Sequence, residues 1–107
     1  MSSLQWNRAF ALEQTAGDEE LLEELLVLFK DSSADDHKKL CQAAASGDAE
    51  GVVAAAHSLK GASASLGIEG IRVLALEIET AARAGSVACA LEKEKALAEL
   101  LLEMDNI

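Results

Sequence analysis

Four short breaks, each containing glycine, divide the sequence into segments in which apolar residues recur at helical spacing. The breaks read TAGDEE, SGDAEG, SLGIEG and RAGSVA, and they begin at Thr15, Ser46, Ser65 and Arg83. Between the breaks, apolar residues return every three or four positions, which is the spacing of an amphipathic helix. The chain contains no proline and is rich in alanine, leucine and glutamate, so its local preferences agree with this spacing. The pattern predicts an all-α protein.

The breaks define four long helices and one short helix. The long helices are expected over residues 18–45, 48–66, 68–84 and 86–104, and the short one over residues 4–14. Four amphipathic helices with short connections predict an antiparallel up-and-down four-helix bundle with a short additional N-terminal helix. The length of 107 residues is close to the commonest size of one domain, so a single helical bundle domain over residues 1–107 is expected.

Local signals mark the ends of these helices. The expected N-caps are Asp18, Asp48 and Ser86. The glycines expected to end helices are Gly47 and Gly85. In the short first segment, we expect Trp6, Phe10 and Leu12 to pack across one end of the bundle. The middle of the first long helix, KDSSADDHKK, is polar, so this part is either exposed or the place of a bend.

The net charge and the length of the apolar runs limit the possible partners and the location of the protein. A formal net charge of −10 at pH 7 argues against nucleic acid or an anionic membrane as a partner, because both attract basic surfaces. Apolar runs such as VLALEI are too short to span a membrane, and the first residues do not resemble a signal peptide. A cytoplasmic protein is therefore expected. Cys41 and Cys89 occur without a metal-binding or redox spacing, so both are expected to be reduced, small apolar side chains.

The helix expected over residues 48–66 has two different faces. Spacings of three and four place one set of residues toward the core: Val52, Ala56, Leu59, Ser63 and Leu66. His57 follows Ala56 and therefore lies about 100° away, at the edge of that stripe. Apart from one lysine, its helical neighbours are small or of modest size: Val53, Ala54, Lys60, Gly61 and Ala64.

Gly61 is unfavourable inside a helix, by about 1 kcal/mol relative to alanine. Because Gly61 has no side chain, another molecule can approach His57 closely. Lys60 can place an ammonium near an anion carried by the imidazole, and imidazole is a good nucleophile near neutral pH. These residues suit a phosphoryl acceptor site, with an exposed histidine of no special role as the simpler alternative.

The stretch AHSLKGASASLG resembles the motif of histidine-containing phosphotransfer (HPt) domains, which reads His-x-Leu-Lys-Gly-x-Ser/Ala with a later glycine that closes the helix. The residues that carry the motif here are His57, Leu59, Lys60, Gly61, Ser63 and Gly67. The segment DEELLEELLVLF resembles the family's first long helix, and VLALEIETAARAG resembles the helix that follows the motif. The resemblance covers most of the chain, roughly residues 6–85.

This resemblance implies a phosphorelay intermediate. His57 would accept a phosphoryl group from an aspartyl phosphate on one receiver domain and pass it to another receiver domain. Lys60 would stabilise the phosphoryl oxygens, and Gly61 would leave room for the partner. The family often has an acidic or amide residue about 22 positions after the histidine, which orients the ring; here it is Glu79, with Glu77 as the competing candidate. A carboxylate that accepts from Nδ1–H would leave Nε2 as the nucleophile.

The resemblance also implies partners. Response-regulator receiver domains would dock on the exposed strip around His57, and a hybrid histidine kinase is a further candidate. The expected partner-binding residues are Val53, Ala54 and Ala64, extended by Leu25 or Leu28. Mg²⁺ would be held by the receiver, and this chain is expected to hold no cofactor, metal or ATP, since it lacks a glycine-rich phosphate loop. The protein would be a monomeric phosphocarrier rather than a free-standing enzyme.

Other interpretations compete with the phosphorelay role. A di-iron bundle needs Glu-x-x-His pairs, but alanine stands three positions before each histidine. His37, in DDHKK, is expected to be an exposed side chain. The main alternative is a helical-bundle adaptor that binds a receiver or kinase domain without carrying phosphate. If the chain is whole, a stand-alone relay module is expected; if it is an excised domain, its parent is expected to be a hybrid sensor kinase.

Overall fold

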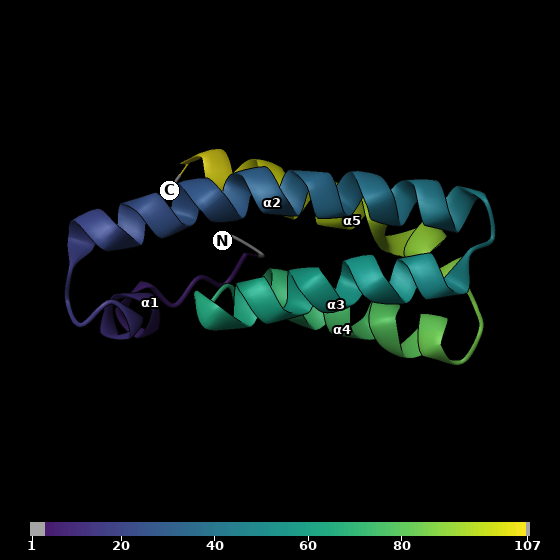
Figure 1. Cartoon of the computed structure of the whole chain (residues 1–107), viewed down its shortest axis with the longest axis horizontal. Helices are drawn as coiled ribbons and strands as arrows, with labels where there is room; N and C mark the ends of the chain where they lie inside the picture. The colour runs from purple at the N-terminus through teal and green to yellow at the C-terminus, as the bar shows by residue number, and fades with distance from the viewer. Residues whose placement is uncertain (1–3, 107) are drawn as a thin grey trace.

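The computed structural model describes residues 4–106, which fold into a bundle of helices (Figure 1). The elements are α1 (Arg8–Gln14), α2 (Glu19–Ala45), α3 (Ala49–Ser65), α4 (Glu69–Arg83), α5 (Ala88–Glu103) and the 3-10 turn η1 (Met104–Asn106). Helix α2 packs against α3 and α5, and α4 packs against the same two helices, so α2 to α5 close a four-helix bundle. The prediction of an up-and-down bundle with a short N-terminal helix is confirmed.

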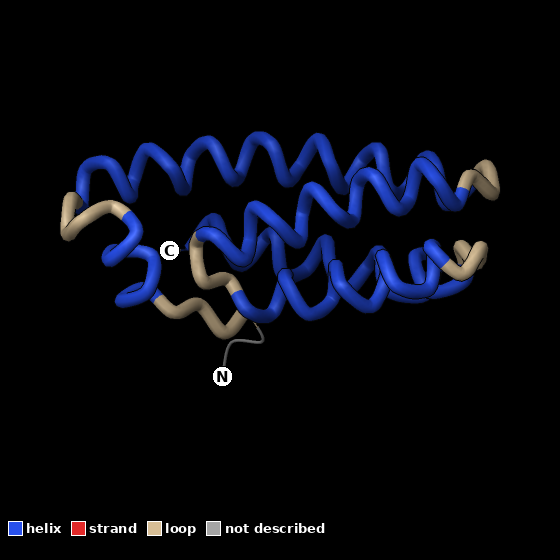
Figure 2. Tube along the Cα trace, turned by 60° about the horizontal axis from the view of Figure 1, so that its bottom comes forward, coloured by secondary structure: helices blue, strands red, loops and turns tan. Residues whose placement is uncertain are grey.

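The connections between the helices are short, as the tan segments of Figure 2 show. Asp18 and Asp48 cap α2 and α3 as predicted, because each carboxylate accepts from a main-chain N–H at 3.0 Å. The prediction that Ser86 caps α5 is wrong by one position. The N-cap is Val87, and the Ser86 hydroxyl reaches only the N–H of Ala88, at 3.2 Å. Gly85 directly follows Ala84, the C-cap of α4, and has a left-handed φ of 93°, as expected of a glycine that ends a helix.

The polar middle of α2 is neither bent away nor fully exposed. The helix is continuous over 27 residues, and Ser33 within it is buried. His37, expected to be exposed, is half-buried, and its Nε2 lies 2.9 Å from the main-chain oxygen of Glu94. The expectation was wrong because α5 packs against this face of α2 and offers a main-chain acceptor that no local pattern in α2 reveals. Cys41 lies one turn further on as a free thiol, and burial together with Glu94 raises its pKa to about 11.

The core-facing stripe of α3 lies where the spacing placed it. All five of its residues are buried: Val52, Ala56, Leu59, Ser63 and Leu66. They meet buried side chains of the other long helices, among them Leu22, Leu40, Ile71, Ile78 and Leu97. Burial of this stripe is the largest stabilising contribution that α3 makes, at about 25 cal/mol per Å² of apolar surface. It also fixes the rotation of α3 about its axis and therefore the direction in which His57 points.

The N-terminal segment is fastened to the turn between α3 and α4. Trp6 Nε1 donates to the carbonyl of Leu66 at 2.9 Å, and the N–H of Gly70 donates to the carbonyl of Leu4 at 2.8 Å. The expected packing of this segment is correct for Trp6 and Leu12, which contact the core. Phe10 also lies at this end, since its ring stands close to Gly67, but it is 37% exposed because Ala11 occupies the buried position of α1.

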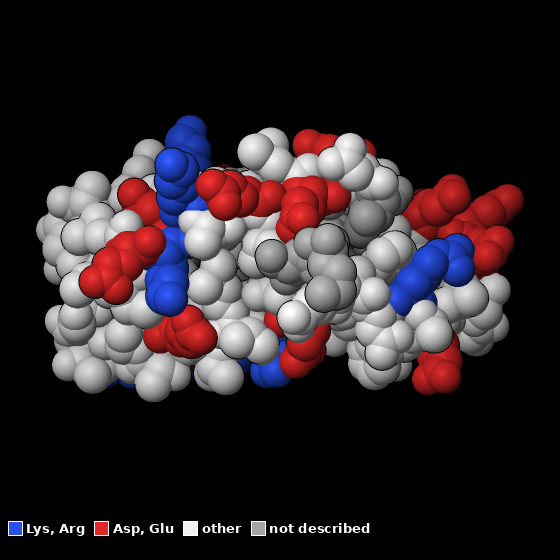
Figure 3. All heavy atoms as spheres, turned by 180° about the vertical axis from the view of Figure 1, so that it is seen from behind, with Lys and Arg blue, Asp and Glu red and all other residues white. Residues whose placement is uncertain are grey.

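Acidic side chains outnumber basic ones in the sequence, 19 to 9. Figure 3 shows the face opposite to that of Figure 1, where basic side chains stand next to acidic ones and a group of acidic side chains gathers at the end formed by α1 and the start of α2. This distribution agrees with the net charge of −10. None of the helices between residues 4 and 106 combines the length and the apolarity that a membrane crossing requires.

Candidate functional site

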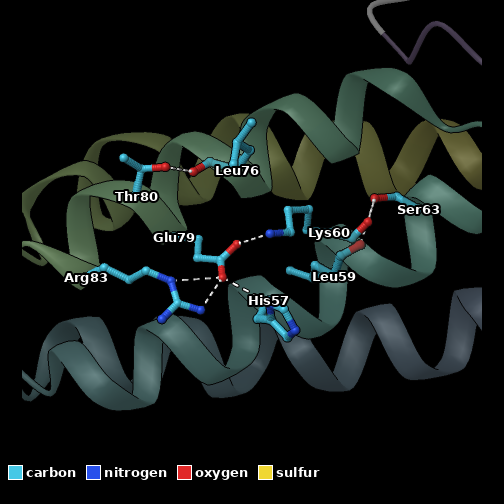
Figure 4. Close-up of polar contacts among 8 residues, drawn as sticks. All are labelled: His57, Leu59, Lys60, Ser63, Leu76, Glu79, Thr80 and Arg83. Atoms are coloured by element: carbon cyan, nitrogen blue, oxygen red, sulfur yellow. Dashed lines mark hydrogen bonds and ion pairs between the residues drawn. The ribbon is translucent and has the colours of Figure 1, made fainter.

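His57 lies on the outer side of α3, with 63% of its side chain exposed. The buried stripe on the opposite side of the helix turns the imidazole toward solvent, as the sequence predicted. Figure 4 shows the ring beside a group of charged side chains from α3 and α4. His57 is therefore both accessible to a partner and held by neighbours within the chain.

Glu79, on α4, is the residue that holds the ring. Its Oε2 lies 3.0 Å from Nδ1 of His57 (Figure 4), and only 3% of its side chain is exposed. This face of α4 packs against the neighbouring helices through buried Ala75, Ile78 and Ala82. The packing places Glu79 at the interface with α3. Glu77, the competing candidate, is exposed, and its Oε2 lies 3.7 Å from Nζ of Lys93 on α5. The structure thus brings Glu79 to His57 and leaves Glu77 elsewhere.

Two cations share the Glu79 carboxylate with His57. Lys60 Nζ lies 2.6 Å from Oε1, and Arg83 donates to Oε2 from Nη2 at 2.7 Å and from Nε at 3.2 Å. Sequence reasoning placed Lys60 beside His57 but did not include Arg83. The signal that could have found it is the spacing of Arg83, four residues after Glu79 on one helix, at which opposite charges pair.

The charge state of Glu79 follows from these contacts. Burial alone raises the pKa of its carboxyl, but the hydrogen bonds from Lys60, Arg83 and His57 outweigh burial and lower the pKa to about 2. The carboxylate is therefore ionised near neutral pH and can only accept hydrogen bonds. In the neutral imidazole Nδ1 must then carry the proton, which leaves the lone pair on Nε2. Among residues 4–106, none forms a hydrogen bond with Nε2.

Gly61 lies on the same exposed side of α3, one turn beyond His57. Apart from its chain neighbours and the backbone of α3 itself, no described atom lies within 4 Å of a Cβ built at Gly61. The packing of the chain therefore does not require glycine here. The backbone conformation does not require it either, because the φ of Gly61 is not positive. Gly61 thus leaves open space on α3 one turn beyond His57.

The predicted partner-binding residues lie in different surroundings. Val53 is half-buried and packs against the core, whereas Ala54 and Ala64 are exposed. An apolar groove of about 420 Å³ runs between α2 and α3 beyond Gly61, and its lining includes Leu25, Leu28 and Ala62.

On the other side of His57, a more polar hollow of about 500 Å³ lies between the same two helices. It includes Ala54, Asp36 and Lys39 in its lining. At this end Ser58 donates to Asp36 at 2.7 Å and links α3 to α2. Neither depression has His57 among its lining residues, and the imidazole is paired instead with Glu79 of α4.

No group of three or more His, Cys, Asp or Glu side chains in the described part of the chain is arranged to hold a metal ion. Glu79, the buried carboxylate of the site, already has nitrogen partners on both of its oxygens. The site thus consists of one accessible imidazole, one buried carboxylate and two cations. This combination suits covalent chemistry at Nε2 of His57 with an anionic group.

Comparison with known proteins agrees with the geometry. Two crystal structures have the same fold: the HPT domain of an Hpt sensor hybrid histidine kinase from Shewanella (TM-score 0.80, 24% identity, 98% of this chain and 94% of that one), and histidine-containing phosphotransfer protein B (HptB) from Pseudomonas aeruginosa PAO1 (TM-score 0.86, 23% identity, 96% and 90%). No curated protein matches the sequence. The sequence model of the Hpt domain matches residues 24–107, a span that contains His57 and all of its charged neighbours. The chain therefore belongs to the Hpt domain family, and this membership supports a phosphotransfer role in two-component signalling.

Proposed function

We propose that this protein is a phosphorelay intermediate that accepts a phosphoryl group on His57 from a receiver-domain aspartyl phosphate and passes it to another receiver domain. The observation that carries the proposal is the pairing of Nδ1 of His57 with the buried, ionised carboxylate of Glu79 at 3.0 Å, while the ring itself stays exposed. This arrangement fixes which nitrogen is nucleophilic and presents it to a partner.

The chemical step follows from this tautomer. The lone pair of Nε2 attacks phosphorus, the bond from phosphorus to the aspartyl oxygen breaks, and the aspartate carboxylate leaves with the electron pair. Nδ1 keeps its proton throughout, so the phosphorylated ring carries positive charge that the Glu79 carboxylate offsets. Transfer to the second receiver is the same step in reverse, with the imidazole as leaving group. The receiver is expected to supply Mg²⁺ and the accepting aspartate.

Electrostatics near the ring favour a phosphoryl group. Lys60 and Arg83 together carry two positive charges, and Glu79 offsets only one of them. Arg83 is the more exposed of the two cations, with 60% of its side chain accessible against 29% for Lys60. The remaining positive charge supports the phosphoryl group in a chain that is otherwise acidic.

The proposed docking surface is the side of α2 and α3 that surrounds His57. Leu28 lines the apolar groove and is 62% exposed, and Gly61 leaves open space on α3 one turn beyond the ring. Exposed apolar side chains beside a groove are the usual anchors of a protein interface. A helix of the receiver that fills this groove would bring its aspartyl phosphate over His57.

Hpt domains interact with receiver and kinase domains in two-component systems. For this chain we propose receiver domains as the phosphate donors and acceptors, with a hybrid histidine kinase as a further partner. A monomer suits a site that two receivers visit in turn, and the proposed setting is the cytoplasm.

Phosphate transfer from a defined donor tests the proposal. Purified receiver domains are labelled with acetyl [³²P]phosphate and Mg²⁺, freed of the small donor and mixed with the wild-type protein or with His57→Gln. We expect the wild type to gain acid-labile phosphate and the variant to gain none. If receivers bind the wild type but never transfer phosphate, the protein is an adaptor instead. If the variant is labelled as well, His57 is not the acceptor.

A further inference from the structure

We infer that Lys60 is a positioning residue, whose ammonium holds the Glu79 carboxylate in place so that Glu79 keeps the His57 ring oriented, and that contact with the phosphoryl group is its lesser role. This inference rests on the proposed phosphotransfer function and assigns Lys60 a place within it. It differs from the expectation drawn from the sequence, in which Lys60 serves the phosphoryl oxygens directly.

The two oxygens of Glu79 have different partners. Oε2 is shared between His57 Nδ1 and the guanidinium of Arg83, whereas Oε1 has Lys60 as its single partner within residues 4–106. The contact of 2.6 Å between Nζ and Oε1 is also the shortest of the set. Oε1 is buried and forms no hydrogen bond within residues 4–106, so if Lys60 moved to a phosphoryl oxygen, Oε1 would also lose its ion-pair partner.

Burial makes the loss of this partner severe. The Glu79 side chain is 3% exposed, so water cannot replace the ammonium, and a buried carboxylate without a partner is strongly disfavoured. The charged or titratable groups that contact Glu79 are Lys60 and His57 from α3 and Arg83 from its own helix. Arg83 is 60% exposed and therefore well screened by water. Lys60 is the less exposed cation and the more effective counter-charge.

Arg83 is the cation that is free to serve the phosphoryl group. Its guanidinium shares Oε2 with His57, so this oxygen keeps a donor even when Arg83 leaves. The two cations thus have different roles. Lys60, the less exposed one, stays paired with the buried carboxylate, and Arg83, the more exposed one, can bind an incoming anion.

A double-mutant cycle separates positioning from direct contact. The transfer rate from a labelled receiver is measured for wild type, Lys60→Met, Glu79→Gln and the double variant. Glutamine at position 79 has no negative charge for Lys60 to pair with. If Lys60 acts only by positioning Glu79, its removal should then have little effect on the transfer rate. In the protein that keeps Glu79, we expect Lys60→Met to slow transfer at least about tenfold. In the protein that carries Glu79→Gln, we expect the same substitution to slow transfer less than about threefold. An equal slowing in both backgrounds would overturn the inference.

A readout that does not depend on phosphate completes the test. The titration of the Glu79 carboxyl is followed by ¹³C NMR in wild type, Lys60→Met and Lys60→Arg. We expect the midpoint to rise by more than about one unit in Lys60→Met, because its first counter-charge is gone, and to stay low in Lys60→Arg, which keeps the charge. An unchanged midpoint in Lys60→Met contradicts the inference.

The two proposals can fail separately. If the wild type takes no phosphate from any receiver, the phosphorelay role fails, but the NMR titration still decides what Lys60 does. If Lys60→Met does not fold, the double variant decides: recovery of the fold on replacing Glu79 by glutamine supports the inference, since the uncompensated buried charge is then gone. Continued failure to fold contradicts it, because Lys60 would then be needed independently of Glu79.

Discussion

Oε2 of Glu79 on α4 lies 3.0 Å from Nδ1 of His57 on α3. The contact joins a side chain that is 63% exposed to one that is 3% exposed, so the accessible imidazole is anchored to the interior of the bundle. The anchor is rigid because the carboxylate is held from three directions by His57, Lys60 and Arg83. The imidazole is thereby kept in one orientation and one tautomer, as the proposed transfer between two partners requires.

Replacing Glu79 by alanine is predicted to slow phosphate transfer to His57 by about 10- to 100-fold. The variant loses a charge-assisted hydrogen bond that fixes the ring, and such bonds contribute about 1.5–3 kcal/mol. Rapid-quench measurement of transfer from a labelled receiver gives the rate, and ¹⁵N NMR of the His57 ring reports the tautomer. Glu77→Ala is the matched control, since Glu77 is exposed on the same helix and forms its ion pair with Lys93. An equal effect of the two substitutions would contradict the assignment of Glu79.

The stability of the protein is predicted to fall in acid partly through Glu79. Its pKa of about 2 in the fold lies below the ordinary value of 4.5, so the carboxylate contributes stability above pH 4.5 and loses that contribution as the pH falls toward 2. A shift of this size corresponds to a contribution on the order of 3 kcal/mol. Because other carboxylates also titrate in this range, the measurement is a comparison.

Urea unfolding of wild type and Glu79→Gln at pH 7 and pH 3 isolates the contribution of Glu79. The variant is expected to lose less free energy of unfolding than the wild type over this interval, because its amide does not titrate. Parallel losses in the two proteins would show that Glu79 is not held ionised by its neighbours.

The ends of the helices and the direction of His57 were predictable because both depend on local rules. Asp18 and Asp48 cap helices through contacts within three residues, and His57 points outward because its helical position differs by about 100° from a buried stripe. The ranking of Glu79 above Glu77 depends instead on how α4 is rotated against α3. The apolar spacing of α4 favours Glu79 in part, because Glu79 lies at the edge of the buried stripe of this helix and Glu77 lies farther from the stripe.

Features that depend on a distant main-chain group were not predictable. His37 stands among charged residues in the sequence, and its acceptor is a carbonyl of α5, 57 residues away. The 37% exposure of Phe10 has a local cause instead, because the short α1 has room for one fully buried side chain and Ala11 occupies that position.

Substitution of Gly61 by leucine is predicted to leave the fold intact and to slow phosphate transfer. Outside the chain neighbours and the backbone of α3, no described atom lies within 4 Å of a Cβ at this position. Because glycine is a poor helix former, the free energy of unfolding should rise by about 0.5–1 kcal/mol. The added side chain would stand between the partner and His57. Circular dichroism and urea unfolding report the fold, and transfer from a labelled receiver reports access.

Gly61→Ala is the graded control for this prediction. A single methyl group should give the gain in helix stability with a smaller loss of transfer rate than leucine gives. Unimpaired transfer in Gly61→Leu would show that the partner does not approach over this residue, and unfolding of the variant would show that glycine is needed for packing.

Leu28 is predicted to anchor the receiver domain, and Leu102 provides a matched comparison. Both leucines are highly exposed, at 62% and 65%, but Leu28 lines the groove between α2 and α3 whereas Leu102 lies on α5 beside a different depression. Leu28→Asp should weaken binding of the fastest-transferring receiver at least about tenfold, as expected of an apolar anchor at the centre of an interface. Leu102→Asp should leave binding unchanged, although it adds the same negative charge.

Isothermal titration calorimetry gives the affinities, and thermal unfolding checks that both variants fold. Equal affinities of the two variants would place the receiver on another face of the bundle, because a charge in the proposed groove must be desolvated when a receiver helix fills it.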